Sequence, residues 1–193
     1  EAIEGFGFAM GPYRVLDMAG LDISWANRKR QAATRDPHER YVSVGDQMCE
    51  RGWFGRKAGR GYYVYAEDGT VIPNAEFEEI LQSARDEFGI RSNTLSDLEI
   101  IERYMTAMVC ESARILDEGI AAKPIDIDAV QLFGYGFPRF RGGPMHYADT
   151  VGIDTVLGRI ERYAADDPIF WAVPDYLLKM QDSGTTFGDQ NGL

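Results

Sequence analysis

Residues 134–154 read GYGFPRFRGGPMHYADTVGID, and residues 5–22 carry a shorter version of the same string, GFGFAMGPYRVLDMAGLD. Both contain Gly-aromatic-Gly-Phe, then Gly-Pro, then Asp, then Gly-apolar-Asp, in that order. The Gly-Pro pair, the Asp and the final Gly and Asp recur at an offset of 132 residues, whereas the first glycine recurs at 129. Because two copies are too few for a solenoid, the repeat predicts a duplicated domain.

Each copy also predicts its own local structure. Its glycines allow a sharp chain reversal, and Gly-Pro then opens a short helix, because a proline at the first helical position loses no hydrogen bond. Gly20 and Gly152 are placed to end these helices, and Asp22 and Asp154 to cap the next ones. The repeat holds one further acid in each copy, which we expect to bond to the backbone near the loop: Asp17 and Asp149.

The longest predicted helix lies upstream of the second copy. Ser96-Asp-Leu-Glu99 is a capping box, and the apolar residues that follow recur with a period close to 3.6 up to Gly119. Further helices are predicted from Pro124 to Gly134, at about 154–165 and at about 174–182. The first copy has no counterpart of the long helix, and the chain has no initiator Met. Both features predict a piece of a longer protein whose first repeat lacks its first helix.

Two β-prone runs around Asp68-Gly69 lie between the copies and predict a hairpin. A helix over 74–88 follows, with Asn74 as its cap and Gly89 as its end. The predicted organisation is therefore a first repeat over 1–66, a hairpin and helical linker over 67–95, and a second repeat over 96–193.

Composition excludes several classes of protein. The chain has 193 residues, 45% apolar residues and a net charge of −11, which is typical of a globular domain and argues against a nucleic-acid or anionic-membrane binder. No apolar run is long enough to span a membrane. The two cysteines, Cys49 and Cys110, cannot form a disulfide framework, which favours a reducing compartment.

Four ordered segments resemble a known family over about residues 3–182. They are the two copies of the repeat, GWFGRKAGRGYYVY at 52–65 and ESARILDEGIAAKPIDIDAV at 111–130. Together they look like the C-terminal region of 3-hydroxyacyl-CoA dehydrogenases, arranged in tandem as in the multifunctional enzymes of fatty-acid β-oxidation. The resemblance implies a mainly α fold of two related helical domains, 6-phosphogluconate dehydrogenase C-terminal-like, with a short β-hairpin between them.

The same resemblance implies the oxidation of 3-hydroxyacyl-CoA to 3-oxoacyl-CoA with NAD. In the family the catalytic His–Glu pair and the NAD site belong to a Rossmann domain, often preceded by an enoyl-CoA hydratase domain. No strand followed by G-x-G-x-x-G occurs here; Gly134-Tyr-Gly136 only begins such a string. We therefore predict no catalytic, cofactor-binding or metal-binding residue in this chain, and no turnover by the chain alone. The alternative is a stand-alone helical module that assembles or binds acyl-CoA without chemistry; the length of the intact gene product discriminates between the two.

The resemblance also implies which residues bind substrate. In the family, the loop and helix at this position line the acyl and thioester site, and an apolar wall with an adaptable Met suits acyl chains. The implied residues are Phe8, Ala9, Met10, Gly11, Pro12 and Leu16. The alternative is a purely structural role, because turn glycines usually serve backbone geometry.

Other reactive residues favour ordinary roles. His38 is expected to be solvated, His146 to be a packing or surface residue, and Cys110 to be an inert core thiol. The basic clusters either contact CoA phosphates or an absent domain, or are simply solvated: Arg56, Lys57 and Arg60, and Arg139 with Arg141.

The predicted loss of the first repeat's long helix has a consequence for assembly. An uncovered apolar face promotes association, so we expect the chain to self-associate. The terminal Gln-Asn-Gly-Leu is not a peroxisomal address, and the sequence therefore favours a bacterial cytoplasm over a peroxisome.

Overall fold

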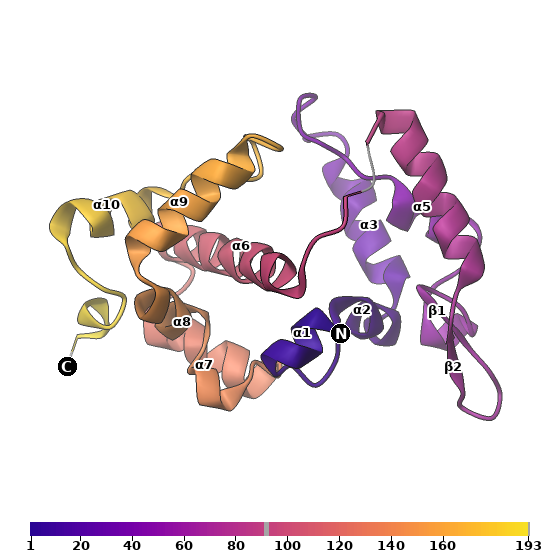
Figure 1. The fold of residues 1–193 in the computed structure, drawn as a ribbon, viewed down its shortest axis with the longest axis horizontal. Coiled ribbons are helices and arrows are strands. Elements are labelled where there is room, and N and C mark those ends of the chain that lie inside the picture. The colour runs from indigo at the N-terminus through magenta and orange to yellow at the C-terminus, as the bar shows by residue number, and fades with distance from the viewer. Residues whose placement is uncertain (91–92, 193) are drawn as a thin grey trace. The chain divides into compact units, whose positions relative to one another are not determined.

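The computed structural model describes residues 1–90 and 93–192 (Figure 1). Within these ranges the chain forms ten α-helices and one two-stranded antiparallel sheet, which confirms the predicted mainly helical fold. The chain divides into two compact units: the hairpin unit, Met10–Thr94, and the long-helix unit, Glu1–Ala9 together with the chain from Leu95. No helix in the described ranges is long and apolar enough to cross a bilayer.

The long-helix unit is built around α6 (Asp97–Asp117). The predicted capping box is present: the Ser96 hydroxyl accepts the N–H of Glu99, and the Glu99 carboxylate accepts the N–H of Ser96. The predicted helices downstream of α6 are confirmed as well. The other helices of the unit are α1 (Ala2–Phe6), α7 (Pro124–Gly134), α8 (Pro144–Val151), α9 (Ile153–Ala164) and α10 (Asp175–Ser183), with short 3-10 turns at Arg139–Arg141 and Asp189–Asn191.

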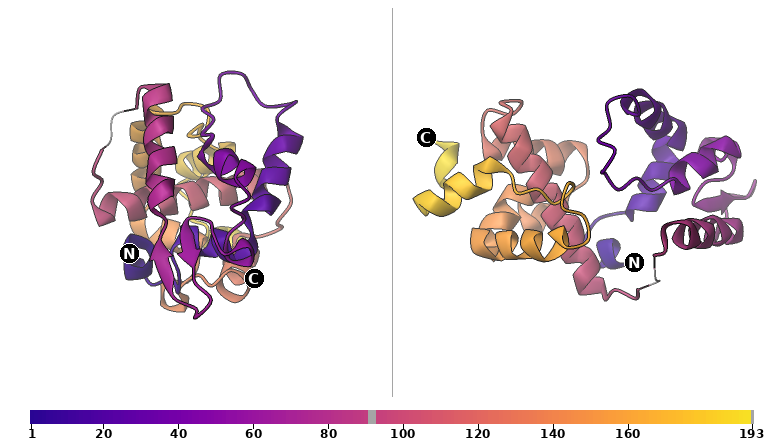
Figure 2. Two further views of the ribbon diagram at one scale, coloured as in Figure 1. Left: turned by 90° about the vertical axis from the view of Figure 1, so that its right-hand side faces the viewer. Right: turned by 90° about the horizontal axis from the view of Figure 1, so that it is seen from above.

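Helix α6 lies against α1, α8, α9 and α10, and the right-hand view of Figure 2 shows α9, in orange, next to it. Its inner face is closed to solvent at Met105, Val109 and Ala113, because these residues follow the helical period that the sequence displays. Tyr163 and Trp171 complete the main core from the α9 side. A 21-residue helix with a satisfied N-terminus therefore serves as the central scaffold of this unit.

The hairpin unit combines short helices with the small sheet. Strands β1 (Tyr63–Tyr65) and β2 (Val71–Pro73) pair antiparallel with Val64 opposite Ile72, which confirms the predicted hairpin. Its core is formed by Leu21, Val44, Met48, Cys49, Trp53, Ile80 and Ala84. The helices are α2 (Pro12–Ala19), α3 (Leu21–Gln31), α4 (Val44–Glu50) and α5 (Ala75–Phe88), with a 3-10 turn at Arg56–Ala58.

The two predicted aspartate caps are wrong. Gly20 and Gly152 each end one helix and begin the next, with φ angles of 101° and 87°, so no acidic residue occupies the capping position. Asp22 instead pairs with Lys57 at 2.5 Å, and Asp154 Oδ1 accepts a hydrogen bond from Gln181. A single glycine with positive φ leaves no room for a capping residue between adjoining helices.

Asn74 begins α5 at the predicted position, but its side chain does not cap the helix. The Asn74 amide donates to the carbonyl of Gly61 at 2.8 Å, so it connects the helix start to the strand region. Gly89 ends the helix with a φ angle of 62°, as predicted.

The two compact units do not coincide with the repeats predicted from the sequence. Residues 1–9 carry first-repeat sequence, yet Ile3 and Phe6 are buried in the long-helix unit. The hairpin and α5, predicted as a linker over 67–95, form part of the hairpin unit. The division into 1–66, 67–95 and 96–193 stays a prediction about sequence similarity.

Candidate functional site

Asp17, on α2, is the most deeply buried polar residue of the hairpin unit, with 0% of its surface exposed. Its carboxylate accepts three hydrogen bonds of 3.0 Å each, from the N–H groups of Tyr62 and Tyr63 and from the Tyr65 hydroxyl. Burial, together with this bond, raises the pKa of Tyr65 to about 12. Asp17 therefore ties α2 to the first strand, which is the structural role that the repeat predicted.

Glycine is required around this carboxylate. A Cβ atom at Gly61 would lie 2.0 Å from Asp17 Oδ1, and one at Gly55 would lie 2.3 Å from the Asp17 carbonyl oxygen. The GRKAGRG segment can therefore pass α2 closely only because it lacks side chains at these two points.

Asp149 has the equivalent task on α8. Its carboxylate accepts the N–H groups of Phe187 and Gly188, both at 2.8 Å. Asp149 is half-buried and makes two bonds, whereas Asp17 is fully buried and makes three. Both copies therefore use the repeated acid to hold a later segment against the short helix.

The substrate residues implied by the resemblance fall on both units. Phe8 packs in an aromatic cluster of the long-helix unit, 5.2 Å from Phe137 and 5.9 Å from Tyr104 between ring centroids, and Ala9 is exposed. The others belong to the hairpin unit: Met10, Gly11, Pro12 and Leu16.

Within the hairpin unit, these residues differ in how far packing explains them. Leu16 is half-buried against the core of the unit, which accounts for its apolar character. Gly11 precedes α2 with φ −70° and ψ 159°, and a Cβ atom there would meet no atom within 4 Å. Neither backbone conformation nor packing therefore requires a glycine at position 11.

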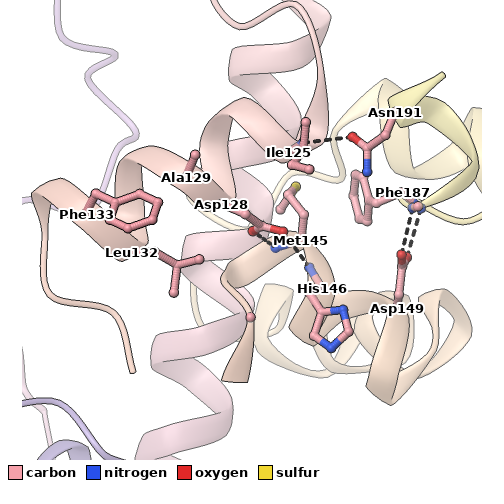
Figure 3. Close-up of a pocket in the computed structure, with 12 residues that line it drawn as sticks. Ile125, Asp128, Ala129, Leu132, Phe133, Met145, His146, Asp149, Phe187 and Asn191 are labelled. Atoms are coloured by element: carbon pink, nitrogen blue, oxygen red, sulfur yellow. Dashed lines mark hydrogen bonds between the residues drawn. The ribbon is translucent and has the colours of Figure 1, made fainter. Parts of the chain in front are cut away.

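A cavity of about 440 Å³ opens in the long-helix unit between α7, α8 and the C-terminal turn (Figure 3). Ile125, Phe133 and Met145 give it apolar walls, and Asp128 and His146 lie at its edge. Asp128 accepts the N–H groups of Met145 at 2.8 Å and His146 at 3.1 Å, so it caps α8. Burial raises the pKa of Asp128 to about 6, against the opposing effect of these two N–H groups.

This arrangement is not an acid–base pair. Asp128 bonds to the main chain of His146, and Figure 3 shows the exposed imidazole directed away from the carboxylate. A general base needs a partner that orients its ring, and within residues 1–90 and 93–192 no side chain forms a hydrogen bond or ion pair with the His146 imidazole. His146 is thus a surface residue, as predicted. Sequence reasoning missed Asp128, although Gly-Gly-Pro before α8 offers no capping side chain of its own and so requires an acceptor from elsewhere.

Four of the five residues in the predicted basic clusters have a partner in the structure. Lys57 pairs with Asp22 and Arg60 pairs with Glu76 at 2.7 Å. Arg141 donates to the carbonyl of Phe6 at 2.7 Å, and Arg139 lies 5.7 Å from the centre of the Phe133 ring. Arg56 alone of the five predicted residues has no such partner in the described ranges, and it lines a second cavity.

The cysteines and His38 lie in environments that give them no special reactivity. Cys49 and Cys110 are buried free thiols, and burial raises the pKa of Cys110 to about 11, which keeps it protonated. His38 is exposed in the 32–43 segment. Over residues 1–90 and 93–192, no group of three or more His, Cys, Asp or Glu side chains is placed to hold a metal ion.

Comparison with known proteins identifies the class. The model of the 3-hydroxyacyl-CoA dehydrogenase C-terminal domain matches residues 1–65 and 100–192. The chain therefore belongs to the 3-hydroxyacyl-CoA dehydrogenase family through its C-terminal domain, and the resemblance drawn from the sequence is confirmed.

Two individual relatives show which kinds of enzyme the chain is similar to. A peroxisomal bifunctional enzyme of Danio rerio is 44% identical over 176 residues, which cover 84% of this chain and 24% of that protein. The fatty acid oxidation complex subunit alpha of Shewanella sp. (strain ANA-3) is 34% identical over 168 residues, or 86% of this chain and 23% of that protein. The chain thus spans about a quarter of the length of these relatives.

A solved structure is similar as well. The dehydrogenase part of multifunctional enzyme 1 from C. elegans superposes with a TM-score of 0.70 at 27% identity, covering 92% of this chain and 40% of that one. The predicted bacterial cytoplasm is wrong, because the peroxisomal relative at 44% identity is more similar than the bacterial subunit at 34%.

Proposed function

We propose that this chain is the C-terminal part of an NAD-dependent 3-hydroxyacyl-CoA dehydrogenase of peroxisomal β-oxidation. The observation that supports it most strongly is the double family match, over 1–65 and 100–192, which follows the internal repeat. The bifunctional relatives support a longer protein with a second activity. The family resemblance implies that this activity is an enoyl-CoA hydratase that precedes the dehydrogenase.

Within that enzyme the 8–12 segment and Leu16 supply a wall for the acyl chain. Met10 is half-buried and unbranched, so it can adapt to chains of different length. Gly11 supports this role. The fold of the hairpin unit does not require a glycine at position 11, whereas close approach of a ligand to the backbone would require one.

NAD binding does not fit the described residues. A dinucleotide of the Rossmann type needs a parallel sheet with a helix N-terminus at its edge, and the sheet in residues 1–90 and 93–192 is a two-stranded antiparallel hairpin. The family resemblance supports a place for the cofactor, which accepts the hydride from the 3-hydroxyl carbon, in a domain outside this chain. The catalytic acid–base pair is assigned to the same domain.

Turnover by the purified chain tests this assignment. We expect no NADH formation from 3-hydroxyacyl-CoA and NAD, while the intact protein that contains this sequence is active under the same conditions. Measurable turnover by the chain alone would show that the chemistry lies within it. A short native gene product without a Gly-rich βαβ unit would favour the non-catalytic alternative.

The proposed acyl-chain wall is tested in the intact enzyme by substitutions at two glycines, each of which has open space where a side chain would lie. Gly11→Leu is expected to raise KM for long acyl chains several-fold more than for short ones, because it fills space that the acyl chain would use. Gly158→Leu is the matched control, since a Cβ atom at Gly158 also meets nothing within 4 Å. Equal effects of Gly11→Leu on long and short substrates would remove position 11 from the wall.

We also propose that the isolated chain self-associates. On α2 and α3 of the hairpin unit, the apolar side chains of Val15, Met18 and Ile23 are 49%, 53% and 63% exposed. Exposed apolar side chains favour burial against another surface. Light scattering is expected to show a mass that rises with concentration, and Met18→Glu with Ile23→Lys is expected to suppress the rise. A constant monomer mass would refute the proposal.

A further inference from the structure

Two arginines of the hairpin unit, Arg14 and Arg56, lack the carboxylate partner that three other cations of the unit have. Lys57, Arg60 and Arg28 each pair with a carboxylate, at 2.5, 2.7 and 2.7 Å. Arg14 and Arg56 form no ion pair and no side-chain hydrogen bond with any residue in the ranges 1–90 and 93–192. Other arginines of this unit, such as Arg40, also form no ion pair in the described ranges, but Arg14 and Arg56 are set apart because they share one cavity.

These two side chains line the same cavity, which has a volume of about 390 Å³. Arg14 comes from α2 and Arg56 from the 3-10 turn before β1, and Met18, Tyr65 and the hairpin turn complete the wall. The volume lies within the range of about 300–1,000 Å³ that small-molecule sites occupy.

The Asp17 network fixes the two walls relative to each other. Asp17 lies one helical turn after Arg14 and bonds to Tyr62, Tyr63 and Tyr65. Gly55, directly before Arg56, passes so close to α2 that a Cβ atom would lie 2.3 Å from the Asp17 carbonyl oxygen. The backbone positions that carry the two exposed arginines are therefore held by buried contacts.

Two like charges beside one cavity repel each other, and an anion bound between them offsets that repulsion. Guanidinium groups present several N–H donors in a planar fork that matches phosphoryl oxygens. Glu67, an exposed residue, also lines the cavity and opposes an anion, but the two arginines outnumber it. We propose that this cavity binds a phosphate-bearing small molecule, with Arg14 and Arg56 holding its phosphoryl oxygens.

The site does not depend on the proposed dehydrogenase function. The phosphoryl group can belong to a free phosphate or diphosphate, or to a nucleotide, because the recognition chemistry is the same. The sequence alone grouped Arg56 with Lys57 and Arg60; the structure pairs it with Arg14, 42 residues away, after the other two cations are neutralised.

Calorimetric titration of the 193-residue chain with inorganic diphosphate and with ADP, at constant ionic strength, tests this site. We expect saturable binding of at least one of them, and a tighter Kd for ADP if the natural ligand is a nucleotide. Arg14→Gln and Arg56→Gln are each expected to weaken binding about tenfold, because each removes charge-assisted hydrogen bonds.

Arg40→Gln is the matched control, since Arg40 lies in the same unit, forms no ion pair in the described part of the chain and lines a different cavity. It is expected to change Kd less than twofold. Glu67→Gln is expected to tighten binding, an effect that misfolding cannot mimic. The proposal is overturned if neither ligand binds saturably, if Arg40→Gln weakens binding as much as the other two variants, or if Glu67→Gln weakens it.

Discussion

Helices α2 and α8 begin with the same Gly-Pro pair, and the glycine serves a different purpose in each. Gly143 has a φ angle of 108°, and a Cβ atom there would lie 2.2 Å from Asp128 Oδ1, so the fold of α8 requires it. Gly11 has a φ angle of −70° and open space around its missing side chain. One sequence signature therefore reflects packing in one copy and leaves room for another function in the other.

The repeated acids, Asp17 and Asp149, also differ between the two copies. Replacing them should change the free energy of unfolding the most. Asp17→Ala leaves three donors without an acceptor in a fully buried place, and we expect it to lower the free energy of unfolding by about 3–5 kcal/mol. Asp149→Ala leaves two donors in a half-buried place, so about 1–3 kcal/mol is expected. Chemical denaturation of each variant measures both values. A larger loss for Asp149→Ala would reverse this ranking of the two copies.

The glycines should give the next largest contrast. Gly143→Ala places a Cβ atom against Asp128 at a positive φ angle, and we expect a loss of about 2–4 kcal/mol. Gly11→Ala meets no atom and keeps an allowed φ angle, so the expected loss is below about 1 kcal/mol. Thermal and chemical unfolding of the two variants should separate them clearly. Equal losses would mean that Gly11 is also a structural glycine.

The smallest effect concerns pH and the cap of α8. The pKa of Asp128 rises from its ordinary value of 3.8 to about 6 in the folded protein, so the folded state binds this proton more tightly than the unfolded state does. The contribution of Asp128 to stability is therefore complete below pH 3.8 and is lost as the pH rises through about 6. Because the carboxyl is only partly buried, we expect a loss of about 1 kcal/mol.

Asp128→Asn cannot ionise and should remove this fall in the free energy of unfolding, as measured by denaturation at a series of pH values. The reverse trend, a stability that rises with pH over the same window in the parent chain but not in Asp128→Asn, would show that the two N–H groups of α8 outweigh burial.

Local sequence rules predicted the elements well and failed where one residue served two elements. The capping box at Ser96, the hairpin around Gly69 and the end of α5 at Gly89 follow from neighbouring residues alone. The caps expected from Asp22 and Asp154 fail because Gly20 and Gly152 join two helices directly. The missed cap, Asp128, lies 17 residues from the N–H group that it accepts, beyond the reach of a local rule.

The sequence by itself determined the duplication, the helical elements and the family, because glycine, proline and capping residues act over a few positions and the repeat copies them intact. Only the tertiary structure decided which cations remain without a carboxylate, which glycines are sterically required, and that residues 1–9 pack with the long-helix unit. Those outcomes depend on distances between side chains far apart in the sequence. Such distances are set by burial and by the closing of hydrogen bonds across the whole unit, not by local preference.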